Sequence, residues 1–189
     1  MKIAVYGGSF QPPHVGHAMV ASWLRWTDRA DEVWIVPTFR HAFGKQLVPY
    51  DRRYLWCQLL AEELGPGVRV SDVEARLDGP STTYRTLCTL RASHPEHTFS
   101  FVCGADQLDG LPRWSEAERL QREFEIIVVG RMGYEGGQPK FPGVSSTAIR
   151  QALAQGVAVE HLLLSSVREA ITEEDIRQLT ALDATQGGA

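Results

Sequence analysis

The chain has few cysteines and no long hydrophobic run, and each absence excludes a class of protein. Its three cysteines, Cys57, Cys88 and Cys103, are widely spaced and form no CxxC pair, so the sequence predicts neither a disulfide framework nor a zinc ribbon. No stretch approaches the roughly 20 apolar residues that a membrane helix needs. The apolar start, residues 1–6, is too short for a signal peptide. We therefore expect a cytoplasmic protein that does not associate with a membrane.

Positive charge is also scarce. The 19 Lys and Arg residues against 23 Asp and Glu residues give a net charge of −4. Binding along a nucleic-acid backbone needs clustered positive charge, so the composition disfavours a nucleic-acid partner, although a local phosphate pocket stays compatible with it. No internal repeat or linker divides the 189 residues, which suffice for one domain with a hydrophobic core.

Short apolar runs alternate with amphipathic stretches along the chain. We expect strands at Ile3–Tyr6, Val33–Val36, Val68–Val73, Thr98–Cys103 and Phe124–Val129. We expect helices at His14–Trp26, Asp51–Leu64 and Thr82–Arg91, with further helices after a glycine-rich loop, Gly130–Gly143. Strands separated by helices form parallel βαβ units. The sequence thus predicts an α/β, Rossmann-like, doubly wound parallel sheet of about five to six strands with helices on both faces.

The predicted domain has a helical C-terminal part and a binding edge. A helical subregion is expected at about 144–182, followed by a tail, 183–189, that frays because it is small and polar. In doubly wound sheets ligands bind beyond the carboxyl ends of the strands. We therefore expect the site in the loops that follow the first, second and fourth strands.

A glycine turn, two prolines and two histidines come directly after the first strand. The string from Gly7 to His17 is GGSFQPPHVGH. Glycines let backbone amides approach phosphate oxygens closely, and the start of a helix adds partial positive charge. His14 and His17 are three residues apart and project from one side of the first turn, while Gly16 leaves room for a flat ring. We predict a phosphate site in which two imidazoles donate hydrogen bonds to developing negative charge. A zinc site is disfavoured because further ligands are lacking nearby.

Hydroxyl groups gather where the first C-terminal helix is expected to begin. The string Val144-Ser145-Ser146-Thr147-Ala148-Ile149-Arg150 offers Ser145 or Ser146 as a helix cap and Arg150 one turn later. Free amides, hydroxyls and an arginine form a second anion clamp. An ordinary capped helix would explain this segment if it stood alone.

The segment after the fourth strand carries a carboxylate and a tryptophan. Gly104-Ala105-Asp106 places a carboxylate at the end of that strand, where it can bind ribose hydroxyls. Trp114, eight residues further on, offers a flat face to an aromatic ring, although filling of the core explains it equally well. By contrast, His94-Pro95-Glu96-His97 lies between a helix and a strand and is expected to be an exposed turn, so no metal bound by protein ligands is predicted.

These strings resemble the motifs of a known superfamily. GGSFQPPHVGH is similar to the GGSFDPPHxGH signature of the HxGH nucleotidyltransferases, and residues 144–150 resemble their SSTxIR motif. Residues 104–120 resemble the GADxLxxLxxWxxxxxL pattern of bacterial nicotinate-nucleotide adenylyltransferases, in which the tryptophan stacks on the pyridine ring. The resemblance covers roughly residues 1–171. It implies transfer of AMP from ATP to nicotinate mononucleotide, giving deamido-NAD and pyrophosphate.

The resemblance also implies a role for each matched residue. His14, His17 and Arg150 are expected to be catalytic. ATP is expected to contact Gly7, Gly8, Ser9, Phe10, His14, Gly16, His17, Gly104, Asp106, Ser145, Ser146, Thr147 and Arg150. The pyridine mononucleotide is expected to contact Lys45, Thr82, Thr83, Asp106 and Trp114. Mg²⁺ is expected to bind through the ATP phosphates and water.

Four departures from the family pattern concern the substrate more than the reaction. Gln11 replaces the usual aspartate or asparagine, and Thr82 replaces a tyrosine. The basic PPHK segment is replaced by residues 38–45, where Arg40, His41 or Lys45 supplies a phosphate contact or the loop is simply solvated. Leu164-Ser165-Ser166-Val167 replaces VPxxV. Nicotinamide mononucleotide or phosphopantetheine as acceptor, a non-catalytic nucleotide sensor, and a homo-oligomer all stay open.

Overall fold

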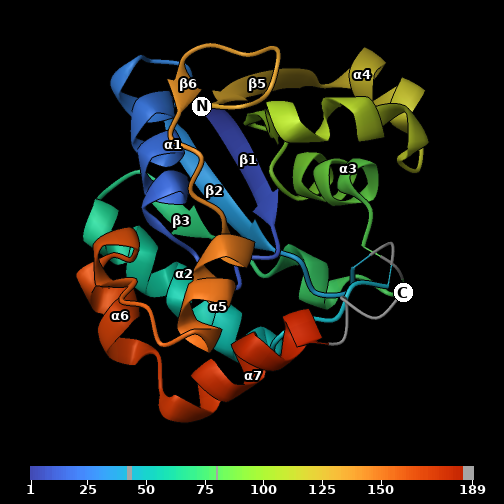
Figure 1. The fold of residues 1–189 in the computed structure, drawn as a ribbon. Helices are drawn as coiled ribbons and strands as arrows, with labels where there is room; N and C mark the ends of the chain where they lie inside the picture. Colours follow the sequence, from blue (N-terminus) through green and yellow to red (C-terminus); the bar gives the residue numbers. More distant parts are fainter. Residues whose placement is uncertain (42–43, 80, 185–189) are drawn as a thin grey trace.

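The architecture is a single parallel sheet between layers of helices. The computed structural model describes residues 1–41, 44–79 and 81–184 (Figure 1). Six strands pair in the order β3-β2-β1-β4-β5-β6, and every pairing is parallel. The strands are β1 (Lys2–Gly8), β2 (Glu32–Pro37), β3 (Val68–Val70), β4 (Thr98–Gly104), β5 (Glu125–Arg131) and β6 (Lys140–Phe141). The predicted Rossmann-like sheet of five to six strands is therefore confirmed.

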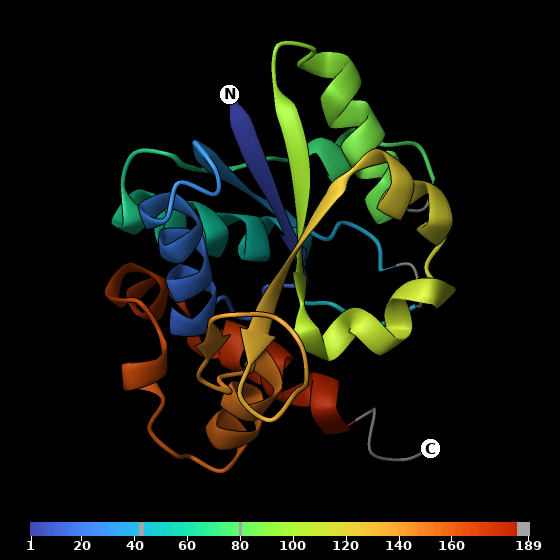
Figure 2. The same cartoon turned by 90° about the horizontal axis from the view of Figure 1, so that it is seen from above.

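Helices cover both faces of the sheet, as Figure 2 shows. The α-helices are α1 (Val15–Trp26), α2 (Tyr50–Leu64), α3 (Thr83–Ser93), α4 (Ala117–Glu123), α5 (Ser146–Ala154), α6 (Ser165–Ala170) and α7 (Glu173–Ala184). Short 3-10 helices are η1 (Val73–Arg76), η2 (Ala105–Arg113) and η3 (Glu160–Leu162). Helices α1 and α2 lie on one face and α3 and α4 on the other. The C-terminal helices, orange to red, gather near the carboxyl ends of the strands.

Two hydrophobic clusters fill the two faces, and the alternation of side chains along each strand divides the core between them. In β1, Ala4 packs with α1 and α2 residues such as Leu24 and Trp56. Its neighbours Ile3 and Val5 pack on the other face with α3 and α4 residues such as Leu87 and Leu120. Because both faces are covered, the strand reads as a continuous apolar run, which is typical of buried parallel sheets.

Most predicted strand and helix boundaries differ from the structure by one or two residues, and the differences at β3, in the glycine-rich loop and at α7 change the description of the chain. β3 ends at Val70, because Ser71 and Asp72 lead into the 3-10 turn η1, so the strand predicted to Val73 is shorter. The predicted loop Gly130–Gly143 contains the end of β5 and the two-residue strand β6. Helix α7 continues to Ala184, two residues into the predicted tail; the rest of that tail, 185–189, lies outside the described residues.

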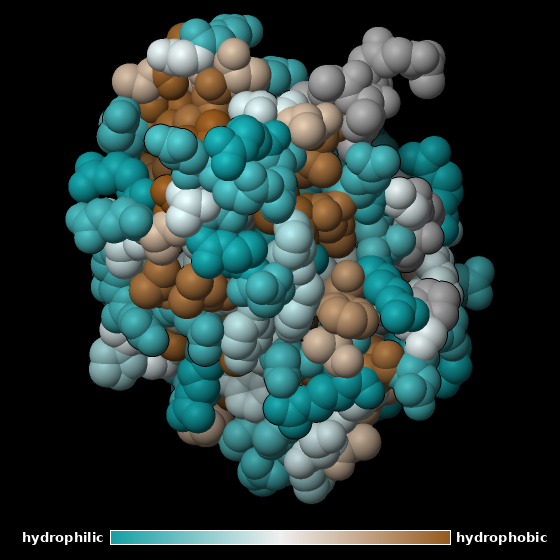
Figure 3. Space-filling view, turned by 90° about the horizontal axis from the view of Figure 1, so that it is seen from below, coloured by the Kyte–Doolittle hydropathy of each residue, from teal (hydrophilic) through white to brown (hydrophobic). Residues whose placement is uncertain are grey.

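The hydropathy of the surface and of the helices is what the ordinary composition of the chain predicts. The face seen in Figure 3 is largely hydrophilic and carries small, scattered hydrophobic patches. Within the described residues, none of the helices combines the length and the apolarity that crossing a membrane requires.

The strand order reverses between β1 and β4. From β1 the chain moves outward through β2 and β3, then returns to pair β4 with the other side of β1. At such a switch point the loops after the two central strands turn in opposite directions and leave a crevice. The loops after Gly8 and Gly104 meet at this crevice.

Candidate active site

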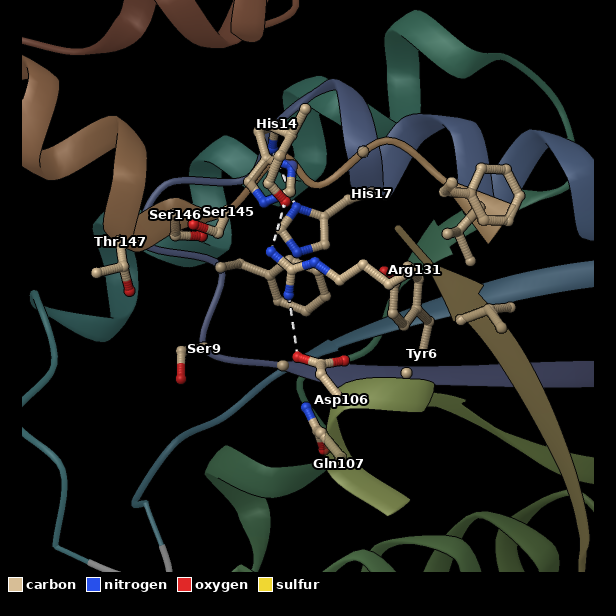
Figure 4. Close-up of a pocket in the computed structure, with 18 of the residues that line it drawn as sticks. Tyr6, Ser9, His14, His17, Asp106, Gln107, Arg131, Ser145, Ser146 and Thr147 are labelled. Carbon is tan, nitrogen blue, oxygen red and sulfur yellow. Dashed lines mark hydrogen bonds and ion pairs between the residues drawn. The ribbon is translucent and has the colours of Figure 1, made fainter. Parts of the chain in front are cut away.

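A cavity of about 270 Å³ opens at the carboxyl ends of β1, β4 and β5 (Figure 4). Its walls come from the loop after β1, the start of α1, the loop after β2, the segment after β4, the end of β5 and the start of α5. It is lined by Tyr6, Gly7, Gly8, Ser9, Phe10, Gln11, His14, Gly16, His17, Val20, Lys45, Val102, Gly104, Asp106, Gln107, Val129, Gly130, Arg131, Phe141, Pro142, Val144, Ser145, Ser146, Thr147 and Arg150.

The two histidines lie together at the start of α1. Their ring centroids are 3.8 Å apart. His17 Nδ1 accepts a hydrogen bond of 3.1 Å from the backbone N–H of His14. An accepting nitrogen carries no proton, so the proton of a neutral His17 ring is on Nε2. His17 can therefore donate one hydrogen bond through Nε2.

Both imidazoles are neutral at physiological pH in this environment. Burial, together with the nearby charge of Arg131, lowers the pKa of His14 to about 4. Burial lowers the pKa of His17 well below its ordinary value, and His14 and Arg131 lower it further. The site thus offers hydrogen-bond donors, while its positive charge comes from arginine.

Two aromatic rings, those of Phe10 and Tyr6, pack against His17. The Phe10 ring lies 4.8 Å from the His17 ring and 5.8 Å from the Tyr6 ring. Phe10 has φ of +47°, a conformation that is rare for a bulky residue and that clusters at functional sites. Gly16 lets the His14 ring approach the backbone, because a Cβ at that position would lie only 3.0 Å from two atoms of that ring. Gly16 is expected to leave room for a flat ring, and in the structure the His14 ring occupies that room.

Arg131, which the sequence analysis did not single out, lies in the centre of the cavity (Figure 4). One guanidinium nitrogen contacts Asp106 Oδ2 at 3.0 Å, and another donates to the Val144 main-chain oxygen at 3.0 Å. Asp106 can take this position because Gly104 has no Cβ to clash with its carboxylate. The pair places a cation and an anion at the switch point.

Helix α5 begins on the opposite wall with its hydroxyl groups engaged. Ser145 is the N-cap, and its Oγ accepts from the Ala148 N–H at 3.0 Å, as expected for a capping serine. Ser146 Oγ donates to the Pro12 main-chain oxygen at 2.9 Å, which fastens α5 to the loop after β1. The N-terminus of α5 thus points its partial positive charge into the cavity beside the histidines.

Arg150 lies one turn further along α5 and is 2% exposed. Its guanidinium donates to the Gln11 main-chain oxygen at 3.0 Å and to Thr147 Oγ1 at 3.3 Å. The Gln11 side chain in turn accepts from the Val48 N–H at 3.3 Å. The glutamine that departs from the family pattern is therefore a buried residue that joins three segments of the cavity wall.

The cavity brings together all thirteen residues predicted to contact ATP, and also Lys45. It does not include Thr82, Thr83 or Trp114. Thr82 caps α3 through a hydrogen bond from the Arg85 N–H, and the Trp114 ring packs edge-on against Phe101 at 5.7 Å. Of the replaced basic segment, Arg40 stacks over the Phe39 ring, and residues 42–43 lie outside the described residues.

Sequence comparisons identify the relatives of this chain. The model of the cytidylyltransferase-like family matches residues 5–152. A protein of Anaeromyxobacter sp. strain K named "Probable nicotinate-nucleotide adenylyltransferase" is 43% identical over 180 residues, which cover 93% of this chain and 96% of that protein. This chain is a member of the nicotinate-nucleotide adenylyltransferase family. Another family member, from Anaeromyxobacter dehalogenans strain 2CP-C, is 46% identical over 167 residues, 86% of this chain and 89% of its own.

A solved structure agrees in fold with this family member. The Plasmodium falciparum nicotinic acid mononucleotide adenylyltransferase complexed with NaAD has a TM-score of 0.81 and 20% identity, and the match covers 94% of this chain and 98% of that chain. At this identity the likeness shows the fold alone.

Asp106 is the carboxylate that lines the cavity within the described part of the chain, and Arg131 already neutralises it. The other polar groups of the walls are N–H groups, hydroxyls, amides, imidazoles and the cationic side chains of Lys45, Arg131 and Arg150. This donor set suits phosphate oxygens better than a metal ion held by protein ligands, which needs several carboxylates or histidines that can converge on one point.

Proposed function

We propose that this protein transfers the adenylyl group of ATP to nicotinate mononucleotide, giving deamido-NAD and pyrophosphate. The observation that carries the proposal is one cavity in which two neutral, buried imidazoles lie beside the N-terminus of α5. Both groups recognise phosphate oxygens. The names of the relatives, which share up to 46% identity over most of the chain, supply the identity of the substrates.

In the proposed reaction an oxygen of the mononucleotide phosphate attacks the α-phosphorus of ATP. A new P–O bond forms, the bond from the α-phosphorus to the bridging oxygen breaks, and pyrophosphate leaves with that electron pair. The attacking phosphate is already ionised, so no general base is needed. Catalysis then consists of alignment and stabilisation of charge on the phosphates.

We assign the stabilisation of charge to His14, His17 and Arg131. His17 Nε2–H donates to an oxygen in the α- and β-phosphate region, and the adjacent His14 ring acts beside it. The backbone amides of the loop after β1, from Gly8 to Phe10, approach the same oxygens. Arg131 adds a guanidinium in the centre of the cavity, where its ion pair with Asp106 balances its charge. Both imidazoles are neutral and held in place. They therefore act as oriented hydrogen-bond donors that do not have to reorganise when the phosphates bind.

We assign the leaving pyrophosphate to the start of α5. Ser146 and Thr147 lie in its first turn, where amide groups point toward the cavity. Arg150 contributes positive charge behind this turn and is held there by Gln11 and Thr147. Mg²⁺, when bound to the phosphates of ATP, supplies further neutralisation of their charge. The walls of the cavity fit such an ion if its ligands are phosphate oxygens and water.

We assign the acceptor end to Asp106, Lys45, Thr82, Thr83 and Trp114. Lys45 lies in the cavity wall and offers charge to the phosphate of the mononucleotide. Thr82, Thr83 and Trp114 lie beyond the cavity, and we retain them as the proposed contacts of the pyridine end. A cytoplasmic location and self-association of the chain stay predictions from the sequence.

The test is pyrophosphate release from ATP and Mg²⁺ with nicotinate mononucleotide or nicotinamide mononucleotide as acceptor. We expect turnover with the acid form, much slower turnover with the amide, and loss of activity when the ion is chelated. The matched control is His17→Asn, which keeps an acceptor for the His14 N–H but has no Nε2 donor. Faster release with the amide would reassign the substrate, and ATP binding without release on either acceptor would indicate a nucleotide sensor.

A further inference from the structure

The turn between α3 and β4 gathers two histidines and a glutamate outside the cavity. His94, Pro95, Glu96 and His97 form it, closed by a hydrogen bond of 3.1 Å from the His97 N–H to the His94 main-chain oxygen. Proline at the second position fixes φ for such a turn. The turn predicted for this segment is present. It places the side chains of His94, Glu96 and His97, all of types that can ligate metals, close to one another.

The ligand atoms of these side chains are close to metal-binding spacing. His97 Nε2 lies 3.3 Å from Glu96 Oε1, and His94 Nδ1 lies 3.8 Å from the same oxygen. All three atoms lie within 4.8 Å of one another. Ligands of a tetrahedral zinc ion with bonds of about 2.0–2.1 Å are roughly 3.4 Å apart. The pair from His97 and Glu96 already has that spacing, and His94 must approach the other two ligands more closely.

Packing against Trp34 holds the two imidazoles. Its indole meets the His94 ring at 5.0 Å and the His97 ring at 6.1 Å, both edge-on. The His97 side chain is 13% exposed, and its Nδ1 is buried without a hydrogen-bond partner among the described residues. A metal ion can therefore bind His97 through Nε2, the atom that lies 3.3 Å from Glu96 Oε1. The His94 side chain, 39% exposed, has room to turn toward the same point.

We propose that His94, Glu96 and His97 bind one divalent transition-metal ion of the zinc type, with water as the fourth ligand. Two imidazoles and one carboxylate suit Zn²⁺ and Ni²⁺ better than Mg²⁺ or Ca²⁺. The site precedes the first residue of β4, whereas the cavity lies beyond the last one. The ion therefore stabilises the fold by joining the end of α3 to the start of the sheet, and it takes no part in adenylyl transfer.

The proposal is tested by adding Zn²⁺ alone to the full chain, with calorimetry and thermal unfolding as the measurements. We expect one saturable site and a rise in Tm that a chelator reverses. His94→Ala and Glu96→Gln should each weaken binding roughly tenfold or more, because each removes one of three ligands. His161→Ala is the matched control: this exposed histidine lies in η3, away from the turn, and its loss should change neither quantity.

A second measurement locates the ion. Ni²⁺ bound at the turn should quench the fluorescence of Trp34, and Trp34→Phe should remove that component of the quenching. Zn²⁺ affinity that survives both His94→Ala and Glu96→Gln, or Ni²⁺ quenching of undiminished amplitude in Trp34→Phe, would overturn the proposal. Pyrophosphate release by His94→Ala should equal that of the unaltered chain; a loss would contradict the separation of this site from the cavity.

Discussion

Arg150 donates a hydrogen bond of 3.0 Å to the main-chain oxygen of Gln11, although 139 residues separate them. Arg150→Ala would leave this buried oxygen without its donor, at a cost of roughly 1–3 kcal/mol, and would remove positive charge from behind the start of α5. We expect Tm to fall and kcat to fall by at least about tenfold. Arg150→Lys keeps the charge but cannot donate in two directions with a rigid fork. If the lysine variant recovers kcat while Tm stays low, charge is the catalytic contribution.

His17 offers a sharper separation of roles. His17→Asn can still accept from the His14 N–H, whereas His17→Gln places an amide N–H near the position of Nε2. We expect both variants to fold, with kcat reduced by roughly 100-fold or more in the asparagine variant and by less in the glutamine variant. Pyrophosphate release under saturating ATP measures this difference. Near-normal turnover by the asparagine variant would exclude donation from Nε2 as a catalytic contribution.

The depressed pKa of His14 makes stability depend on pH. Between pH 6.5 and about 4 the unfolded chain binds a proton at His14 that the folded chain does not. The stability associated with the neutral ring is therefore full above pH 6.5 and is lost progressively as pH falls toward 4, with a limit of about 3 kcal/mol. Urea unfolding across this range should show a smaller dependence on pH for His14→Asn than for the unaltered chain.

Two further variants check that interpretation. His161→Asn changes the same residue type at an exposed position and should leave the pH dependence as it is. Arg131→Gln removes a positive charge that lowers the pKa of both cavity histidines, so it should raise those pKa values in an NMR titration. An unchanged pH dependence in His14→Asn would show that other groups, such as His17 or carboxylates, produce it.

Trp114 tests the acceptor end. It packs against Phe101 outside the cavity, so a structural role would lower Tm without separating the two substrates. If Trp114 stacks on the pyridine ring, Trp114→Ala should raise KM for the mononucleotide far more than KM for ATP, and Trp114→Phe should recover much of the loss. Equal changes in the two KM values would remove it from the substrate site.

The site residues that could be predicted from the sequence are those that lie in contiguous motifs. The string from Gly7 to His17 and the one from Val144 to Arg150 each combine local backbone requirements with chemistry, so their place beside the cavity could be predicted. Arg131 could not, because it is the last residue of β5 and belongs to no such string, and its role depends on Asp106, 25 residues away. Only the pairing of β4 with β5 brings the two together.

The wrong boundaries have a similar cause. Val70 and Val73 look like parts of one strand, yet β3 is an edge strand with one neighbour, and the Ser71 hydroxyl accepts from the Val73 N–H to begin a turn. Strand β6 has two residues and no apolar pattern of its own. It is a strand because Gly130 and Arg131 offer it a partner. Pairing of this kind depends on tertiary context, which local propensity does not contain.

The hydrogen bond from Ser146 to Pro12 spans 134 positions of the chain. During synthesis the first wall of the cavity therefore emerges long before its counterpart on α5 exists. Because contacts of such large sequence separation are slow to form, a nascent chain ending near residue 131 would contain the histidine string without a closed nucleotide site. Competence to bind ATP should consequently appear late and abruptly, when α5 leaves the ribosome and docks against the loop that was translated first.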